Sequence, residues 1–158
     1  CALVATVSCS GSDDTAKKVP STPYRRALTQ VEESLGRAKG ICAVVEISDN
    51  IAELPAPTSR DEARSEVELV ATWFDALAAV ADDEKIEGAA QLRAATKRQT
   101  KDAEAAKYDP EKIGNWNGNI SDPKAAAVMA QLRALAATDC GQPVATIPPD
   151  TTAAPTPS

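Results

Sequence analysis

The chain contains no histidine among its 158 residues. Histidine is the commonest metal ligand and the commonest general acid or base near neutral pH, so the chemistries that most often depend on it have no support here. The sequence also has no Gly-rich phosphate loop, no Gly-x-Ser-x-Gly elbow, no Cys-x-x-Cys-His haem site and no Glu-x-x-His pair. We therefore expect no metal, no cofactor and no catalytic activity.

Aromatic residues are also scarce, at 3% of the chain, whereas alanine is abundant. The buried area must therefore come from Leu, Val and Ile side chains and from close contacts between alanine-lined helices. The chain has room for one domain with a single modest core, and such a core gains from a covalent cross-link. No hydrophobic stretch is long enough to cross a membrane as a helix.

Excess positive charge is absent as well, since the formal net charge is −6 and the pI is near 4.7. Nucleic-acid binding needs a basic surface that displaces phosphate counterions, so we expect no nucleic-acid partner. The one basic run, Lys97–Lys101, is interleaved with Glu87, Asp102 and Glu104. It is predicted to be a solvated helix face.

The first nine residues, CALVATVSC, are apolar, and the polar stretch SGSDDTAKK follows abruptly. Val7, Ser8 and Cys9 resemble the end of a bacterial lipoprotein signal, although Thr6 stands where that pattern usually has Leu. The resemblance implies that Cys9 carries lipid, that Cys1 belongs to a removed signal peptide, and that the protein is anchored at the extracytoplasmic face of the membrane. The charged n-region of a signal is absent, so either the chain begins inside its signal or the apolar head is a frayed N-terminus.

Two helices are expected in the first part of the globular region. Behind a start signal at Ser21–Pro23, apolar residues recur at intervals of three and four up to Gly40. Apolar residues keep this spacing through residues 41–54, although their β-branched composition also suits a strand. No other segment offers such a strand a partner, so the stretch is predicted to be helical, with Cys42 facing inward and Pro55–Pro57 ending it.

The next helix has the most apolar face in the chain and is expected at the centre of the bundle. Thr58 or Ser59 caps its start. Its apolar face consists of Val67, Val70, Trp73, Phe74, Leu77 and Val80. The acidic cluster Asp82–Glu84 marks a break and is expected to cap the start of a fourth helix, which extends to about Lys107 and ends at Tyr108–Pro110.

A final helix is predicted between Asp122 and Gly141. Asp122 suits the N-cap and Pro123 the first helical position, where a missing N–H has no consequence. Gly141, directly after Cys140, is a stop signal. One helical face consists of Ala125, Val128, Met129, Leu132, Leu135 and Ala136. This helix therefore delivers a thiol at its end.

Cys42 and Cys140 are the cysteines of the globular region, and two cysteines in an exported chain usually pair. A redox-active or metal-binding thiol is the alternative, but the sequence has neither a Cys-x-x-Cys spacing nor a histidine partner for it. Closing so long a loop contributes at most about 4 to 5 kcal/mol. We predict an all-α bundle of four to five helices joined by a Cys42–Cys140 disulfide.

These features together resemble small secreted or lipid-anchored helical proteins of actinobacteria. The resemblance covers residues 19–141 and depends on the tethered N-terminus, on Cys42, and on a final helix that begins with Asp-Pro and ends at Cys140 and Gly141. It implies an extracellular or membrane-anchored location and a helical fold. It implies no activity, because such proteins are mostly of unassigned function.

The loop Asn115-Trp116-Asn117-Gly118-Asn119 has the most unusual local composition. Asn and Gly favour left-handed turns, and Trp116 can fold back over the end of the bundle. Alternatively, Trp116 with Asn115, Asn117 and Asn119 contacts a ligand or partner. The loop has no carboxylate at the first ligand positions of a calcium loop, so no cation site is expected there.

The sequence favours a non-catalytic extracytoplasmic lipoprotein that acts as an accessory or protein-binding module, with the membrane and an envelope protein as its partners. Residues 1–20 are expected to be a signal remnant and flexible tether, and residues 21–141 the helical domain. Residues 142–158 are rich in Pro and Thr and are expected to be a disordered tail.

An apolar cavity between helices is the basis of an alternative function, the binding of a small molecule or lipid. Trp73, Phe74 and Met129 would line that cavity. Adjacent aromatic residues on an amphipathic stripe are more often part of a core. A binding cavity and a filled core are therefore the two outcomes to compare.

Overall fold

A computed structural model describes residues 22–113 and 122–141, and in these ranges every regular element is an α-helix. The helices are α1 (Pro23–Arg37), α2 (Gly40–Ala52), α3 (Arg60–Asp83), α4 (Ala89–Ala105), α5 (Pro110–Ile113) and α6 (Pro123–Cys140). The predicted all-α fold is confirmed. It gains one element, the four-residue α5, which is too short to show helical periodicity. The expected tether and tail lie outside the described residues.

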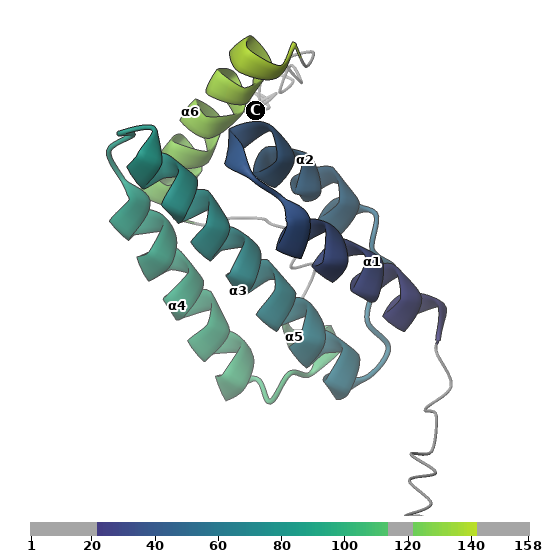
Figure 1. Cartoon of the computed structure of the whole chain (residues 1–158). Coiled ribbons are helices and arrows are strands. Elements are labelled where there is room, and N and C mark those ends of the chain that lie inside the picture. The colour runs from purple at the N-terminus through teal and green to yellow at the C-terminus, as the bar shows by residue number, and fades with distance from the viewer. Residues whose placement is uncertain (1–21, 114–121, 142–158) are drawn as a thin grey trace, which may run out of the picture.

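α3, the longest helix at 24 residues, is the central member of the bundle (Figure 1). α1, α2, α4 and α6 all contact α3, and α4 lies beside it along most of its length. The predicted apolar face is buried at every position: Val67, Val70, Trp73, Phe74, Leu77 and Val80. The most apolar stripe in the sequence therefore forms the axis of the fold.

Alanine occupies several of the buried positions on α3 and α4, two helices that pack against each other. Ala78 and Ala81 on α3 and Ala89 and Ala95 on α4 are all buried. Because these side chains end at Cβ, the two helix axes can approach closely. Small buried side chains thus make up part of a core that has few aromatic residues.

Residues 41–52 are helical, as predicted, in spite of their β-branched composition, and the helix ends two residues before Leu54. The buried positions of α2 are Ile41, Val44, Ile47 and Ile51, and Leu54 is buried just after its end. These residues share one helical face, which packs against α3 and α6. Burial of that face outweighs the small intrinsic penalty for β-branched residues in a helix.

The predicted starts of α1, α3 and α6 are confirmed by side-chain caps. Thr22 precedes Pro23 at α1, and Asp122 precedes Pro123 at α6. Of the two caps considered for α3, Ser59 is the one used. Each cap side chain accepts a hydrogen bond from a backbone N–H of the first turn, which would otherwise have no partner.

The acidic cluster Asp82–Glu84 ends α3 and does not start α4, so that prediction is wrong. Lys85 adopts a left-handed conformation with φ 57°, and the Ile86 N–H donates to the Ala81 carbonyl oxygen at 2.8 Å. These are the features of a Schellman helix end. This helix end could not be recognised from the sequence, because Lys85, and not the usual Gly, occupies the left-handed position. The N-cap of α4 is Gly88.

α4 carries the basic run on its solvent side, as predicted. Lys97, Arg98 and Lys101 are exposed. Arg98 forms an ion pair with Asp122, the N-cap of α6, so the run contributes to the contact between α4 and α6. The interleaved acidic residues Asp102 and Glu104 are exposed as well.

α6 has small apolar residues on its outer side as well as on its inner side. Its inner side is buried at Ala125, Val128, Met129, Leu132 and Ala136, while Leu135 is half-buried. Ala126, Ala130 and Ala134 are exposed on the opposite side. The predicted inward face is therefore confirmed.

Among the glycines that the structure describes, Gly88 should be the one at which substitution is most damaging. Its φ is 121°, and an added Cβ would overlap the Cγ2 atom of Val128 on α6. We expect Gly88→Ala to lower the free energy of unfolding by about 1–3 kcal/mol, through backbone strain and overpacking. Chemical denaturation of the purified chain measures this.

Gly36 provides the matched control. It lies inside α1, and an added Cβ would meet no atom within 4 Å. Gly36→Ala should therefore stabilise the protein by about 0.5–1 kcal/mol, because alanine loses less conformational freedom in a helix than glycine. Equal effects of the two substitutions would contradict the proposed role of Gly88.

Candidate functional site

The two cysteines of the helical domain form a disulfide that joins α2 to α6. Cys42 lies in the first turn of α2 and Cys140 is the last residue of α6, with Cα atoms 5.8 Å apart. The predicted pairing is confirmed. Cys42 does not face inward, however, because Ile41 and Val44 take the inward positions of that turn and leave Cys42 exposed. The cross-link therefore lies at the surface of the bundle.

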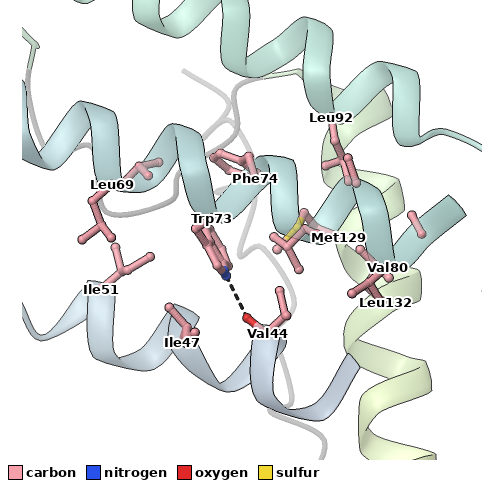
Figure 2. Close-up of a cluster of buried hydrophobic side chains, with 14 of the residues drawn as sticks. Val44, Ile47, Ile51, Leu69, Trp73, Phe74, Val80, Leu92, Met129 and Leu132 are labelled. Carbon is pink, nitrogen blue, oxygen red and sulfur yellow. Dashed lines mark hydrogen bonds between the residues drawn. The ribbon is translucent and has the colours of Figure 1, made fainter. Parts of the chain in front are cut away.

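Trp73, Phe74 and Met129 lie in the core between α2, α3 and α6 (Figure 2). Their exposed fractions are 1%, 1% and 4%. The two aromatic rings lie 4.9 Å apart between centroids, and the Trp73 indole N–H donates to the Val44 carbonyl oxygen at 2.8 Å. All three are members of the buried hydrophobic cluster, and the binding cavity expected beside them stays a prediction.

The other predicted site residues lie outside the described part of the chain. They are Cys9, the expected point of lipid attachment, and the loop residues Asn115, Trp116, Asn117 and Asn119. Lipid on Cys9 and a contact surface at Trp116 therefore stay predictions.

The described residues do reveal a polar cluster that the sequence had not indicated. Thr22, Tyr24, Thr58, Glu62 and Glu66, which we call the α1–α3 cluster, lie where α1 crosses the start of α3. The two carboxyl groups belong to residues one helical turn apart. Glu62 is 8% exposed and Glu66 is 3% exposed, which is unusual for Glu. The cluster therefore contains the buried ionisable side chains that are the best candidates for a functional site in the described interior.

Glu62 is well supplied with hydrogen-bond donors. Its carboxylate accepts from the Thr58 N–H at 2.9 Å, the Thr58 hydroxyl at 2.8 Å and the Thr22 hydroxyl at 3.3 Å. The Thr58 N–H, assisted by both hydroxyls and the charge of Arg25, lowers the pKa of Glu62 below its usual value. Glu62 is accordingly ionised at neutral pH and ties the start of α1 to the start of α3.

Glu66 has the opposite environment. Burial raises the pKa of Glu66, and the hydrogen bond from the Tyr24 hydroxyl opposes this effect only in part. Burial also raises the pKa of Tyr24, with a further contribution from the negative charge of Glu66, so Tyr24 stays protonated. The cluster thus holds two neighbouring carboxyl groups whose pKa values move in opposite directions.

Such a pair is the usual arrangement of a general acid with a general base. Catalysis also requires that substrate reach the groups. At exposed fractions of 8% and 3%, Glu62 and Glu66 offer a substrate little accessible surface. The arrangement favours a structural role in joining α1 to α3.

Part of the cluster could have been found from the sequence. Ser59-x-x-Glu62 is a capping-box pattern, in which the glutamate accepts from backbone N–H groups before the helix. Here it accepts from the Thr58 N–H, one residue before the cap. The contact of Tyr24 with Glu66 had no local signal, because it depends on how α1 packs across α3 and joins residues 42 positions apart.

Glu62→Gln should destabilise the protein by about 1 kcal/mol at pH 7, because the amide oxygen accepts more weakly than a carboxylate. Since the folded pKa of Glu62 is lowered, its contribution is present above about pH 4.3 and is lost as the pH falls through the folded pKa. Urea denaturation between pH 3 and pH 7 measures the difference. Glu68→Gln, at an exposed position of α3, is the control and should change stability by less than about 0.5 kcal/mol. Equal effects at both pH extremes would argue against an ionised Glu62.

The described residues offer no further site of known type. They contain no group of three or more His, Cys, Asp or Glu side chains that could hold a metal ion. None of the described helices combines the length and hydropathy needed to traverse a lipid bilayer. No family model, curated protein or solved structure matches the chain. Any functional conclusion therefore depends on the residues of the chain itself.

Proposed function

We propose that this protein is a non-catalytic accessory or protein-binding module on the extracytoplasmic side of a bacterial membrane, held there by lipid on Cys9. The Cys42–Cys140 disulfide carries the proposal, because stable disulfides form in oxidising compartments and are rare in the cytosol. The apolar CALVATVSC segment, with a small residue directly before Cys9, supports the lipid anchor.

A role in binding is supported by the interactions that join the helices to one another. Glu62 joins α1 to α3, the Trp73 indole N–H joins α3 to α2, and the disulfide joins α2 to α6. Each of these interactions connects two helices, so the bundle presents a pre-organised surface. A rigid surface loses little conformational entropy when it binds a partner.

Mass analysis of the protein from native membranes tests the location. The mature chain should begin at Cys9 and carry acyl chains, and titration under denaturing conditions should find no free thiol on Cys42 or Cys140. Cys9→Ser should leave the fold intact and move the protein to the soluble fraction. A native chain that begins at Cys1 without added lipid mass would contradict the proposed membrane anchor. Two free thiols would contradict the proposed extracytoplasmic location.

Affinity purification from native membranes tests the role in binding. The wild-type chain and the Cys9→Ser chain have the same described surface, but we expect the anchored form to meet an envelope partner more often. Chemical cross-linking before lysis should therefore give a defined heteromeric product that is reduced for Cys9→Ser. Recovery of a bare monomer from both forms, at native expression levels, would contradict a binding module.

A further inference from the structure

The Tyr24 hydroxyl lies between two acceptor atoms on α3. Its oxygen is 3.1 Å from the Glu62 carbonyl oxygen and 3.1 Å from the Glu66 Oε2 atom. A phenolic hydroxyl has one proton and can make one full donor bond. If Glu66 were ionised, its carboxylate and the Glu62 carbonyl would compete for that proton.

A neutral Glu66 removes this competition. A protonated carboxyl group has an O–H of its own, which can donate to the Tyr24 oxygen while Tyr24 donates to the Glu62 carbonyl. All three oxygen atoms are then joined by two hydrogen bonds with the observed separations. One proton on Glu66 therefore lets both separations be full hydrogen bonds, whereas with an ionised Glu66 the single Tyr24 proton is shared between two acceptors.

The number of donors around each carboxyl group leads to the same conclusion. Three donor bonds reach the Glu62 carboxylate, whereas Tyr24 is the single hydrogen-bond partner of the Glu66 side chain among the described residues. A buried carboxylate is stable when several donors surround it, and an undersupplied one takes up a proton instead. Glu66, at 3% exposed, is the undersupplied member of the pair.

We propose that Glu66 is a pH-sensitive latch, which in its neutral form donates to Tyr24 and holds α1 on α3, and which releases α1 when it ionises. On ionisation the Glu66 proton passes to solvent, and the Tyr24 proton turns toward the new carboxylate. The buried charge then has one donor, so the state in which α1 opens and water reaches Glu66 becomes more populated. This inference concerns the fold alone and does not depend on the proposed function.

The groups that act on the latch come mainly from α1. Tyr24 contacts Glu66 directly, Glu32 lies near enough to affect Tyr24, and Arg25 acts on Glu62. Glu62 is the ionised neighbour on α3 itself. α2, α4 and α6 also pack on α3, and no charged side chain that they contribute in the described ranges affects the pKa of Glu66.

The direction of the pH effect follows from the raised pKa of Glu66. The stabilisation from its neutral form is complete below the pKa of an unstructured glutamate, about 4.3, and is lost as the pH rises through the folded pKa. The closing equilibrium of α1 should weaken about tenfold for each pH unit between the two pKa values. The stabilisation from Glu66 therefore has the opposite pH dependence to that from Glu62, which is lost as the pH falls.

Amide hydrogen exchange of the full chain tests the latch in the wild type and in Glu66→Gln. After correction for the intrinsic exchange rate, protection of α1 in the wild type should fall with rising pH, while protection of α4 stays unchanged. Glu66→Gln, whose amide donates to Tyr24 at any pH, should keep α1 protected throughout. Parallel pH dependence of α1 in the two chains would overturn the proposal.

A direct titration keeps the proposal testable if the variant folds poorly. The 13C resonance of the Glu66 side-chain carboxyl in the wild-type chain reports its ionisation, and Glu62 serves as an internal comparison. Glu66 should titrate above the usual glutamate range and Glu62 below it. A Glu66 carboxyl that is fully ionised at pH 5 would overturn the proposal, whatever the exchange data show.

Discussion

Cys42→Ser should lower the melting temperature of the protein by roughly 10–20 °C, the largest effect expected from any single substitution in the bundle. The disulfide closes a loop that separates its cysteines by 98 residues and so restricts almost the whole described chain when it is unfolded. In the chain-entropy treatment such a loop contributes about 4–5 kcal/mol, and measured losses of native disulfides are about 2–5 kcal/mol. Differential scanning calorimetry measures the change.

Substitution of the other cysteine, Cys140, distinguishes the effect of the lost cross-link from the effect of a serine at position 42. Cys140→Ser should be as destabilising as Cys42→Ser, and the double variant should be no worse than either one, because the same bond is lost in all three. Reduction of the wild-type chain should reproduce the effect. An unchanged melting temperature in Cys42→Ser would show that the bundle does not depend on the cross-link, and additive losses would show that the cysteines act separately.

The features that the sequence predicted correctly are those with a local physical cause. Asp122 and Pro123 start α6 because the side-chain acceptor and the missing N–H act within one turn. Gly141 ends α6 because its left-handed conformation, with φ 65°, suits glycine. The disulfide followed from the number of cysteines in the region. Such signals can be read without knowing the rest of the fold.

The features that the sequence did not predict depend on contacts between helices. The inward direction assigned to Cys42 was wrong because Ile41 and Val44 compete for the same buried side of α2. The Tyr24–Glu66 contact depends on the path of α1 across α3, which no periodicity specifies. Tyr24 is buried on α1, but its polar partner lies 42 residues away.

Trp73→Ala should lower the free energy of unfolding by about 3–5 kcal/mol, the second largest effect expected. The side chain is 1% exposed, contacts the Phe74 ring and donates to the Val44 carbonyl of α2. Its truncation removes a large buried surface and leaves a void between α2 and α3. The surrounding helices can close this void only in part, because the disulfide holds α2 to α6. Equilibrium denaturation in guanidinium chloride measures the loss.

Trp73→Phe is the matched control, and the pair also distinguishes the two interpretations of this region. Phe keeps an aromatic ring and loses the indole donor, so we expect a smaller loss of about 1–2 kcal/mol. If Trp73 instead lined an open ligand cavity, its truncation would remove few contacts, and Trp73→Ala would cost no more than Trp73→Phe. A large difference between the two variants therefore supports a filled core, and nearly equal values would restore the small-molecule alternative.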